Sequence, residues 1–330
     1  MSVYRCNVCK FRYDEWVGDT KNGVEPGVPF SRLAGSVCSN CGLQGGRHEE
    51  LDEIKYAGLE ATYYDQFAGK AGIAFYRDWL LGFGDNISVL ELGVGTGRIA
   101  VELARNGIAV VGVDWSTDML RLAEKKKRHV LKEREHLLEL VEGNARELDL
   151  DWTFTHVLLP EGIFQQAVSR RAQRQFLRTV RAHLREEGIV AIDILLPPMH
   201  DSWSVLRRKH VFPDRMVYQR VEGETSLVRQ AFRYILTYET FLDQVEQPRY
   251  RVEREMALLL PGELCLLLEA EGFEVLELHE KHQTESAGKA VEGFAMDRWQ
   301  HGGYPFASVG NSDCAASRYT ITAKKVRYLL

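Results

Sequence analysis

An α/β fold with a mostly parallel sheet, preceded by a small metal-binding domain, is the fold class that the sequence predicts. From about residue 60 onward, apolar stretches of strand length alternate with stretches of helical period. This order is typical of parallel strands joined by right-handed helical crossovers. Before residue 50 the hydrophobic runs are short, and four of the six cysteines form two Cys-x-x-Cys pairs. We therefore expect two domains, at residues 1–50 and 51–330.

Length and composition restrict the class of protein. The chain has 330 residues, 45% of them hydrophobic, which suffices for one full-sized core and a small second domain. A net charge of −5 gives no long-range attraction toward nucleic acid or an anionic membrane. No apolar stretch approaches the ~20 residues that span a bilayer, and the first residues lack the pattern of a signal peptide. We expect a cytoplasmic protein with no nucleic-acid or membrane partner; the sequence does not indicate its oligomeric state.

The elements of the second domain follow from local periodicity. Core strands are expected at residues 89–92, 109–113, 138–142, 155–159, 189–196, 273–278 and 319–323. Helices are expected at 98–106, after Ser116, at 174–184 with Gly188 as the break, and from Pro261. The basic run 125–129 follows a helical stretch and is expected to be a solvated helix face.

An insertion interrupts the core pattern between about residues 200 and 260. Period-two alternation there predicts antiparallel strands. Together with residues 302–305, this insertion is expected to cover the active face as a lid. Its aromatic residues are candidates for a substrate pocket, although the alternation places about half of them in a core. These residues are Tyr218, Phe232, Tyr234 and Tyr238.

A glycine-rich motif, Glu91-Leu92-Gly93-Val94-Gly95-Thr96-Gly97, lies directly after one strand and directly before a helix. Glycines let a backbone approach a ligand closely, and the helix start offers free N–H donors. Asp114 ends the next strand, where a carboxylate can accept hydrogen bonds from both ribose hydroxyls. A tight turn alone would also explain the glycines. The G-x-G-x-G spacing differs from the G-x-G-x-x-G of pyrophosphate sites, which disfavours a nicotinamide oxidoreductase.

Taken together, these motifs resemble class I S-adenosylmethionine-dependent methyltransferases of the small-molecule N- and O-methylating type, over roughly residues 60–325. The resemblance implies a Rossmann-like, seven-stranded sheet and S-adenosylmethionine as the cofactor. It also implies that one set of residues contacts this cofactor. The set is Tyr64, Glu91, Gly93, Gly95, Gly97, Asp114, Trp115, Met119, Asn144, Ala145 and Leu159. Asn144 replaces an acid that is common in the family, and Trp115 has helix-start packing as its alternative role.

Methyl transfer from a sulfonium is an in-line displacement with an activated leaving group. The enzyme must therefore align the donor with a small-molecule acceptor, through nitrogen or oxygen, and receive one proton. Candidate proton acceptors are Glu161 at a strand end, His200 after the fifth strand, and His301 in a glycine-rich loop. For each of the three, an ordinary polar surface role is the alternative.

Two thiolate pairs, Cys6 with Cys9 and Cys38 with Cys41, suit a tetrahedral iron or zinc ion. The surrounding sequence resembles rubredoxin over about 45 residues, which favours one iron. The matching aromatic residues are Tyr4, Phe11, Tyr13 and Phe30. Lys10 and Ser39 depart from the family pattern, and no tryptophan precedes the third cysteine, so we expect a looser core.

The role of this metal stays open between two possibilities. A domain this small needs a staple, which favours a structural role. The alternative is a redox role with a redox partner. In that case the protein would be an electron-transfer or redox-sensing protein whose methyltransferase-like domain binds cofactor without catalysis.

Overall fold

A computed structural model provides the description of the chain. The described residues are 3–6, 9, 11–15, 18–25, 27–33, 38, 40–42, 48–51, 56–70, 72–199, 202–281 and 317–326. The chain divides into two compact units. The first consists of Met1–Lys55 with Ser169–Ala172, and the second of Tyr56–Val168 with Gln173–Leu330.

The first unit contains a three-stranded antiparallel sheet in the order β2-β1-β3. Its elements are β1 (Val3–Cys6), β2 (Arg12–Asp14), the short 3-10 helices η1 (Thr20–Asn22) and η2 (Phe30–Arg32), and β3 (His48–Leu51). Aromatic residues from separate elements pack together. The rings of Tyr4 and Phe30 stack with centroids 4.1 Å apart, and the ring of Tyr13 lies 5.7 Å from that of Phe30. The hydroxyl of Tyr13 donates to the carbonyl of Val28 at 2.6 Å. Three of the four aromatic residues expected in this small core are therefore in contact.

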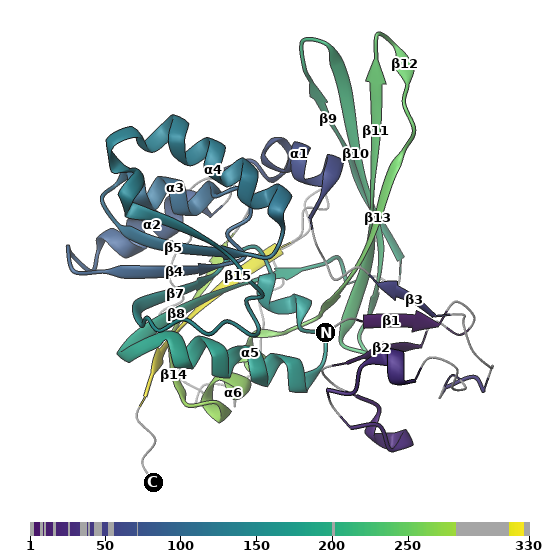
Figure 1. Cartoon of the computed structure of the whole chain (residues 1–330), viewed down its shortest axis with the longest axis horizontal. Coiled ribbons are helices and arrows are strands. Elements are labelled where there is room, and N and C mark those ends of the chain that lie inside the picture. Colours follow the sequence, from purple (N-terminus) through teal and green to yellow (C-terminus); the bar gives the residue numbers. More distant parts are fainter. Residues whose placement is uncertain are drawn as a thin grey trace, which may run out of the picture. The chain divides into compact units, whose positions relative to one another are not determined.

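The second unit is built on a seven-stranded sheet in the order β14-β15-β8-β7-β4-β5-β6 (Figure 1). Strands β8, β7, β4, β5 and β6 are parallel, whereas β15 pairs antiparallel with both β8 and β14. The bounds are β4 (Ser88–Leu92), β5 (Ala109–Asp114), β6 (Leu138–Glu142), β7 (Phe154–Leu159), β8 (Leu184–Leu196), β14 (Phe273–Lys281) and β15 (Ser317–Lys325). The predicted seven-stranded α/β fold is confirmed.

Helices cover both faces of this sheet, with α2, α3 and α4 on one face and α5 and α6 on the other (Figure 1). The helices are α1 (Gly58–Ala68), α2 (Ile73–Leu81), α3 (Arg98–Arg105), α4 (Thr117–Leu131), α5 (Arg170–His183) and α6 (Pro261–Ala270), with 3-10 turns η3 (Lys132–Leu137) and η4 (Ile163–Gln166). Fully buried apolar side chains of α2, α3 and the central strands form one core cluster, which includes Leu80, Leu103 and Val89. This core packs α2 and α3 against β4 and β5.

The start of the strand near Gly188 differs from the prediction, which placed it at residue 189. Helix α5 ends at His183 and β8 begins at the next residue, so Gly188 lies inside the strand. The pairing of β7 with β8 shifts register between Phe154 and His156, and Glu187 has a positive φ of 61°. A bulge in the ladder explains both observations, because it admits extra residues, here three on β8, without ending the strand.

The predicted insertion is an antiparallel sheet of its own, in the order β12-β11-β10-β9 with β13 paired to β11. Its strands are β9 (Ser202–Val211), β10 (Arg215–Ser226), β11 (Ala231–Leu242), β12 (Val245–Glu246) and β13 (Tyr250–Ala257). A small core joins this sheet to α1, because Val217 and Tyr238 pack with Tyr63 and Phe67. Residues 302–305, the other part of the expected lid, lie outside the described residues.

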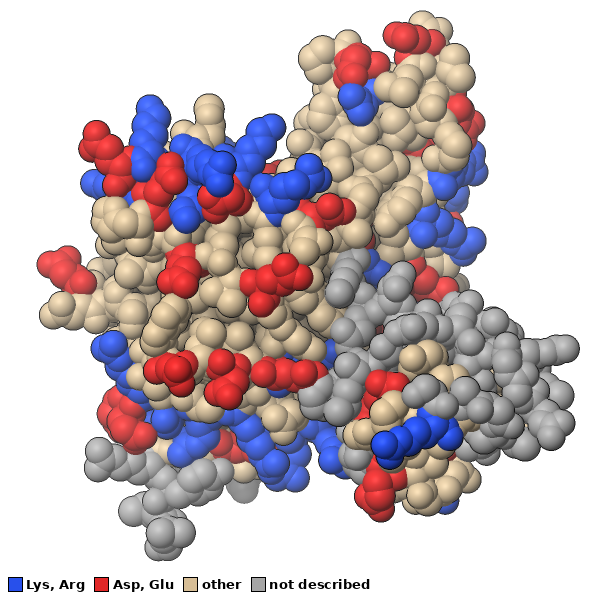
Figure 2. Space-filling view, viewed as in Figure 1, with Lys and Arg blue, Asp and Glu red and all other residues tan. Residues whose placement is uncertain are grey.

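The basic run lies on α4 and carries acidic neighbours. Arg128 and Lys127 both pair with Glu124, at 2.8 Å and 3.7 Å. Figure 2 shows blue and red side chains interspersed along this edge of the molecule. Mixed charge of this kind is typical of a solvated helix face. Among the described residues, no helix is both long and apolar enough to cross a bilayer.

Candidate cofactor and metal sites

The glycine loop connects β4 to α3 at the carboxyl edge of the sheet. Gly93, Gly95 and Gly97 have φ values of 74°, 55° and 74°, in the left-handed region that favours glycine. The backbone amide of Gly93 donates to the carbonyl of Val113 on β5 at 2.8 Å. A Cβ atom placed on Gly95 would meet no atom closer than 4.0 Å. The loop therefore leaves open space beside its central residue, as a ligand that contacts backbone requires.

Asp114 ends β5 and faces this loop. One carboxylate oxygen accepts the backbone N–H of Gly95 at 2.8 Å, and the other accepts that of Ser116 at 2.9 Å. Burial raises the pKa of Asp114, while the N–H groups of Ser116 and Gly95 oppose the shift. A carboxylate offers about four acceptor positions, so capacity remains beside these backbone donors for ribose hydroxyls. The structure thus brings the two strongest elements of the sequence motif together.

Trp115 and Met119 follow at the start of α4. The hydroxyl of Ser116 caps the helix by accepting the backbone N–H of Met119 at 3.2 Å. Met119 is buried, whereas Trp115 is half-buried with the guanidinium of Arg146 above its ring at 5.9 Å. The contact with Arg146 was not predicted. Contact of either residue with adenine stays a prediction.

The loop after β6 carries Asn144 and Ala145, both half-buried. The backbone amide of Gly143 donates to the carbonyl of Asp114 at 3.0 Å, which places this loop beside the β5 end. The side-chain oxygen of Asn144 accepts the N–H of Arg146 at 3.1 Å, and its nitrogen donates to Glu147 at 3.3 Å. The amide therefore braces its own loop, which an aspartate could do only in part because it has no donor.

Two further predicted residues are buried in the strands. Leu159, at the end of β7, has no exposed surface. Glu91 is 2% exposed, and burial raises its pKa to about 8, with the guanidinium of Arg98 opposing the shift. Its Oε2 atom has no hydrogen-bond partner among the described residues. A buried acceptor without a partner beside the glycine loop fits a ligand that brings a donor.

Glu161 follows β7 and has a positive φ of 54°, unusual for a residue other than glycine. Its Oε1 atom accepts from Arg98 at 3.1 Å and from Arg318 at 3.0 Å. A carboxylate held by two nearly buried guanidiniums ties α3, β7 and β15 together. This geometry favours a positioning role for Glu161, while its role as proton acceptor stays a prediction. His200 and His301 lie outside the described residues.

Two buried groups of this cluster were missed in the sequence. Arg318 lies on β15, far from the glycine motif in the chain, and no local pattern indicates its position. Asp193, fully buried in β8, accepts a hydrogen bond from Thr320 and faces the backbone amide of Glu161 at 3.4 Å. Arg98 had a usable signal, because it directly follows Gly97 at the start of α3.

Tyr64 lies on α1 beside the same cluster. The guanidinium of Arg98 lies 5.7 Å from the centroid of its ring. Burial, with a smaller contribution from Glu161, raises the pKa of Tyr64 well above its ordinary value. Tyr64 is therefore a neutral hydroxyl at the edge of the glycine-loop site.

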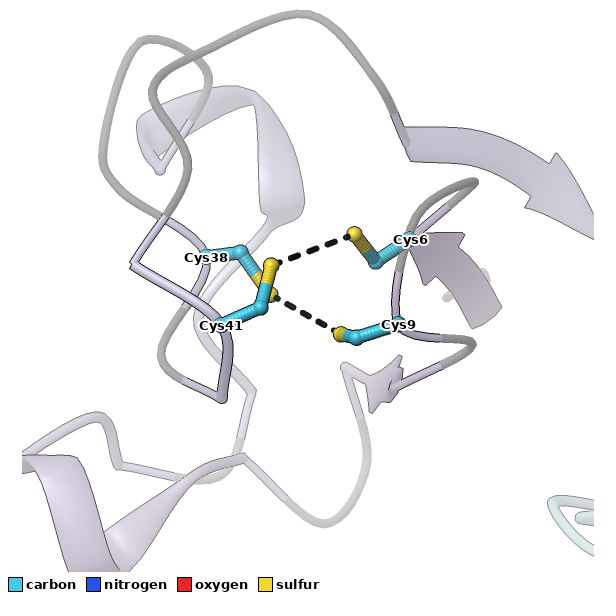
Figure 3. Close-up of side chains that lie close together, drawn as sticks. All are labelled: Cys6, Cys9, Cys38 and Cys41. Carbon is cyan, nitrogen blue, oxygen red and sulfur yellow. Dashed lines mark hydrogen bonds between the residues drawn. The ribbon is translucent and has the colours of Figure 1, made fainter.

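The four predicted metal ligands of the first unit converge from two turns (Figure 3). All four sulfur atoms lie within 4.8 Å of one another. The Sγ atoms of Cys6 and Cys41 are 3.9 Å apart, and those of Cys9 and Cys38 are 3.7 Å apart. Metal–sulfur bonds of about 2.3 Å in a tetrahedron give sulfur–sulfur edges of about 3.8 Å. The arrangement therefore fits one tetrahedral ion.

The environment of Cys9 favours the thiolate form that a metal requires. A hydrogen bond from the side chain of Asn40 contributes most, and the backbone at Phe11 adds to it. Together they lower the pKa of Cys9 to about 6. The backbone amide of Cys6 also donates to the carbonyl of Phe11 at 2.8 Å, which closes the first ligand turn.

Comparison with known proteins matches a part of each unit. A family model described as Rubredoxin matches residues 3–47, and one described as Methyltransferase domain matches residues 89–188. A rubredoxin-like segment therefore precedes a methyltransferase domain in this chain. The methyltransferase match contains the glycine loop and Asp114, whereas the rubredoxin match contains all four cysteines.

Individual relatives agree with this assignment. The cypemycin N-terminal methyltransferase of Streptomyces sp. is 34% identical over 136 residues, which cover 40% of this chain and 53% of the relative. The CcbJ methyltransferase from Streptomyces caelestis has a TM-score of 0.62 and 20% identity, covering 84% of this chain and 100% of that one. The sugar N-methyltransferase KedS8 from Streptoalloteichus sp. ATCC 53650 has a TM-score of 0.61 and 15% identity, covering 86% and 99%. The two structures establish the fold of the methyltransferase. The chain spans about half the length of the cypemycin enzyme.

Proposed function

We propose that this protein transfers a methyl group from S-adenosylmethionine to a nitrogen atom of a small-molecule acceptor. The observation that carries the proposal is the hydrogen bond between the carboxylate of Asp114 and the backbone amide of Gly95. It fixes a diol-binding carboxylate beside a loop whose backbone is open to a ligand. S-adenosylmethionine would supply an activated methyl group at this site.

Each predicted residue then has a role in binding. Gly93, Gly95 and Gly97 would receive the methionine part of the cofactor along their backbone. The ribose and adenine would be held by Asp114, Trp115, Met119, Asn144 and Ala145. Glu91, Leu159 and Tyr64 would complete the walls of the site. Because Tyr64 and Glu161 both contact Arg98, the acceptor would be aligned at this end of the sheet.

The names of the relatives support nitrogen as the acceptor atom. The cypemycin enzyme is described as an N-terminal methyltransferase, and KedS8 as a sugar N-methyltransferase. An amine that attacks a sulfonium must lose one proton, which solvent or one of the candidates Glu161, His200 and His301 would receive.

The test is cofactor binding followed by turnover. We expect calorimetric titration to show binding of S-adenosylmethionine and none of NADH. We also expect release of S-adenosylhomocysteine when small amines are added. Binding of NADH alone would contradict the proposal. Cofactor binding without product release from any amine, alcohol or cell-extract fraction would favour the electron-transfer alternative.

For the first unit, we propose one iron ion held by Cys6, Cys9, Cys38 and Cys41, with a structural role. The sulfur positions and the rubredoxin match support it. The purified protein should be red and contain about one iron per chain, whereas a colourless protein with zinc would contradict the choice of metal. Cys38→Ser should lose the metal, while Cys265→Ala, at a buried cysteine of α6, should keep it. A reversible redox wave coupled to turnover would contradict a purely structural role.

A further inference from the structure

A buried ion pair joins α1 to the inserted sheet. Glu60 on α1 and Arg254 on β13 are 1% and 8% exposed, and a nitrogen of Arg254 lies 2.5 Å from Oε2 of Glu60. Two atoms of the pair have no hydrogen-bond partner among the described residues, namely Oε1 of Glu60 and Nε of Arg254. Leaving a buried donor and a buried acceptor unsatisfied costs about 1–3 kcal/mol each, so the two atoms need an explanation, and a bound ligand would supply one.

Aromatic rings surround this pair. The guanidinium of Arg254 lies 5.2 Å from the centroid of the Tyr56 ring, and Tyr234 is the direct cross-strand neighbour of Arg254. The rings of Tyr56 and Tyr64 meet edge to face at 5.7 Å. All three tyrosines are partly exposed, in contrast to the ion pair. Access of a small molecule to the pair would therefore require one of these partly exposed rings to move.

The same tyrosines connect the pair to the methyltransferase site. Glu60 and Tyr64 are four residues apart on α1 and so share one face of that helix. Tyr64 in turn contacts Arg98, which binds Glu161 at the end of β7. Helix α1 is also fixed to the cofactor side, because the amide of Gly58 donates to Asp118 on α4 at 2.9 Å. The ion pair and Tyr64 thus lie on the same face of α1, and Tyr64 lies at the end of the sheet where the acceptor would be aligned.

The chemistry of the two unpartnered atoms identifies a class of ligand. A carboxylate oxygen among aromatic rings is suited to an ammonium or amine group. A guanidinium N–H beside it suits an oxygen atom, such as that of a hydroxyl group. We propose that Glu60 and Arg254 recognise the acceptor, a small polyhydroxylated amine whose nitrogen binds Glu60 and whose neighbouring hydroxyl binds Arg254. The inference rests on the proposed methyltransferase function and adds the substrate class and two specificity-determining residues.

Burial supports the choice of an amine. It raises the pKa of Glu60 to about 7, against the opposing effect of Arg254. The carboxylate is therefore short of stabilising partners, and a bound ammonium group would supply one.

The test uses a matched pair of sugars, glucosamine and glucose, titrated into the full-length protein loaded with S-adenosylhomocysteine. This product nucleoside occupies the cofactor site and transfers no methyl group. Glucosamine should bind at least tenfold more tightly than glucose, and Glu60→Gln should abolish that preference. Arg254→Met should weaken the binding of both sugars about tenfold. Equal binding of the two sugars, no binding of either, or a preference that survives Glu60→Gln would overturn the proposal.

Two controls separate recognition from stability. Glu271 is also a buried glutamate held by arginines, Arg174 and Arg178, which belong to α5. Glu271→Gln should lower the melting temperature but leave the sugar preference unchanged. If a single variant of the pair fails to bind S-adenosylhomocysteine, the double variant Glu60→Gln with Arg254→Gln avoids a lone buried charge and takes its place.

The binding experiment is independent of catalysis. Sugar binding that depends on Glu60, without methyl transfer from S-adenosylmethionine to any amine, would support the recognition pair and contradict the proposed function. Methyl transfer to glucosamine with the same KM in the wild type and in Glu60→Gln would contradict the pair and support the function.

Discussion

The two sides of the methyltransferase site are built from different parts of the chain. On the cofactor side, the glycine loop and Asp114 lie within 22 residues of one another, and backbone atoms supply most of the contacts. On the proposed acceptor side, the contacts are made by side chains from α1, β11, β13 and β15. Backbone sites need glycines at fixed spacing, whereas side-chain sites need no local pattern. A site built from backbone atoms can therefore be predicted from a sequence, whereas a site built from side chains can be found only in the folded structure.

The largest effect on cofactor affinity is expected for a substitution of Asp114, on the cofactor side. Asp114→Ala removes two charge-assisted hydrogen bonds to the ribose hydroxyls, so the affinity for S-adenosylmethionine should fall by about 100-fold, or about 3 kcal/mol. Calorimetric titration measures the change. Asp85→Ala, at an exposed position, is the matched control and should bind normally. Unchanged affinity in Asp114→Ala would break the assignment of the cofactor side.

Glu91 tests whether the cofactor side also holds a carboxyl group whose pKa is raised by burial. Its pKa is raised from 4.5 to about 8 by burial, so the folded protein binds one more proton than the unfolded protein between these values. The stability that this group contributes is complete below pH 4.5 and is lost as pH rises through 8. Glu91→Gln removes this loss, so its stability relative to the wild type should rise by on the order of 2 kcal/mol from pH 5 to pH 8.

Urea unfolding of both proteins at the two pH values measures this difference. Glu60 titrates in the same direction, but it is present in both proteins, so its contribution cancels. Parallel pH profiles of the wild type and Glu91→Gln would show that Glu91 is not perturbed in the folded protein.

The smallest effect on S-adenosylmethionine binding is expected for an alanine substitution in the glycine loop. Gly93 lies in this loop, whereas Gly107 lies in a turn outside it. Gly93→Ala would place a Cβ atom 2.9 Å from Ile163 at a φ of 74°, whereas Gly107→Ala meets nothing within 4 Å at a φ of 90°. Both changes should cost about 1 kcal/mol of stability from the positive φ. Only Gly93→Ala should also weaken S-adenosylmethionine binding, by about tenfold. Equal cofactor affinities in the two variants would contradict a ligand-binding role for this loop.

The sequence predicted the core strands, the inserted sheet and the four cysteines, because each depends on period or spacing. It placed the start of β8 too late, at residue 189, because a bulge allows Gly188 to lie inside the strand. It also missed Arg318 and the ion pair of Glu60 and Arg254. Isolated charged residues in amphipathic stretches look like surface residues, and only tertiary packing makes them buried partners. The roles of His200 and His301 as proton acceptors, which their positions after the fifth strand and in a glycine-rich loop suggested, remain predictions.

The position of β15 has a consequence for the synthesis of the protein. This strand lies between β8 and β14, and its Arg318 completes the pair of guanidiniums on Glu161. A nascent chain that has emerged only as far as β14 cannot yet form that part of the sheet, although the glycine loop and Asp114 are already outside the ribosome. The part that contains the glycine loop and Asp114 can therefore fold during translation, whereas the edge of the sheet that holds Glu161 closes only after residue 325 has emerged.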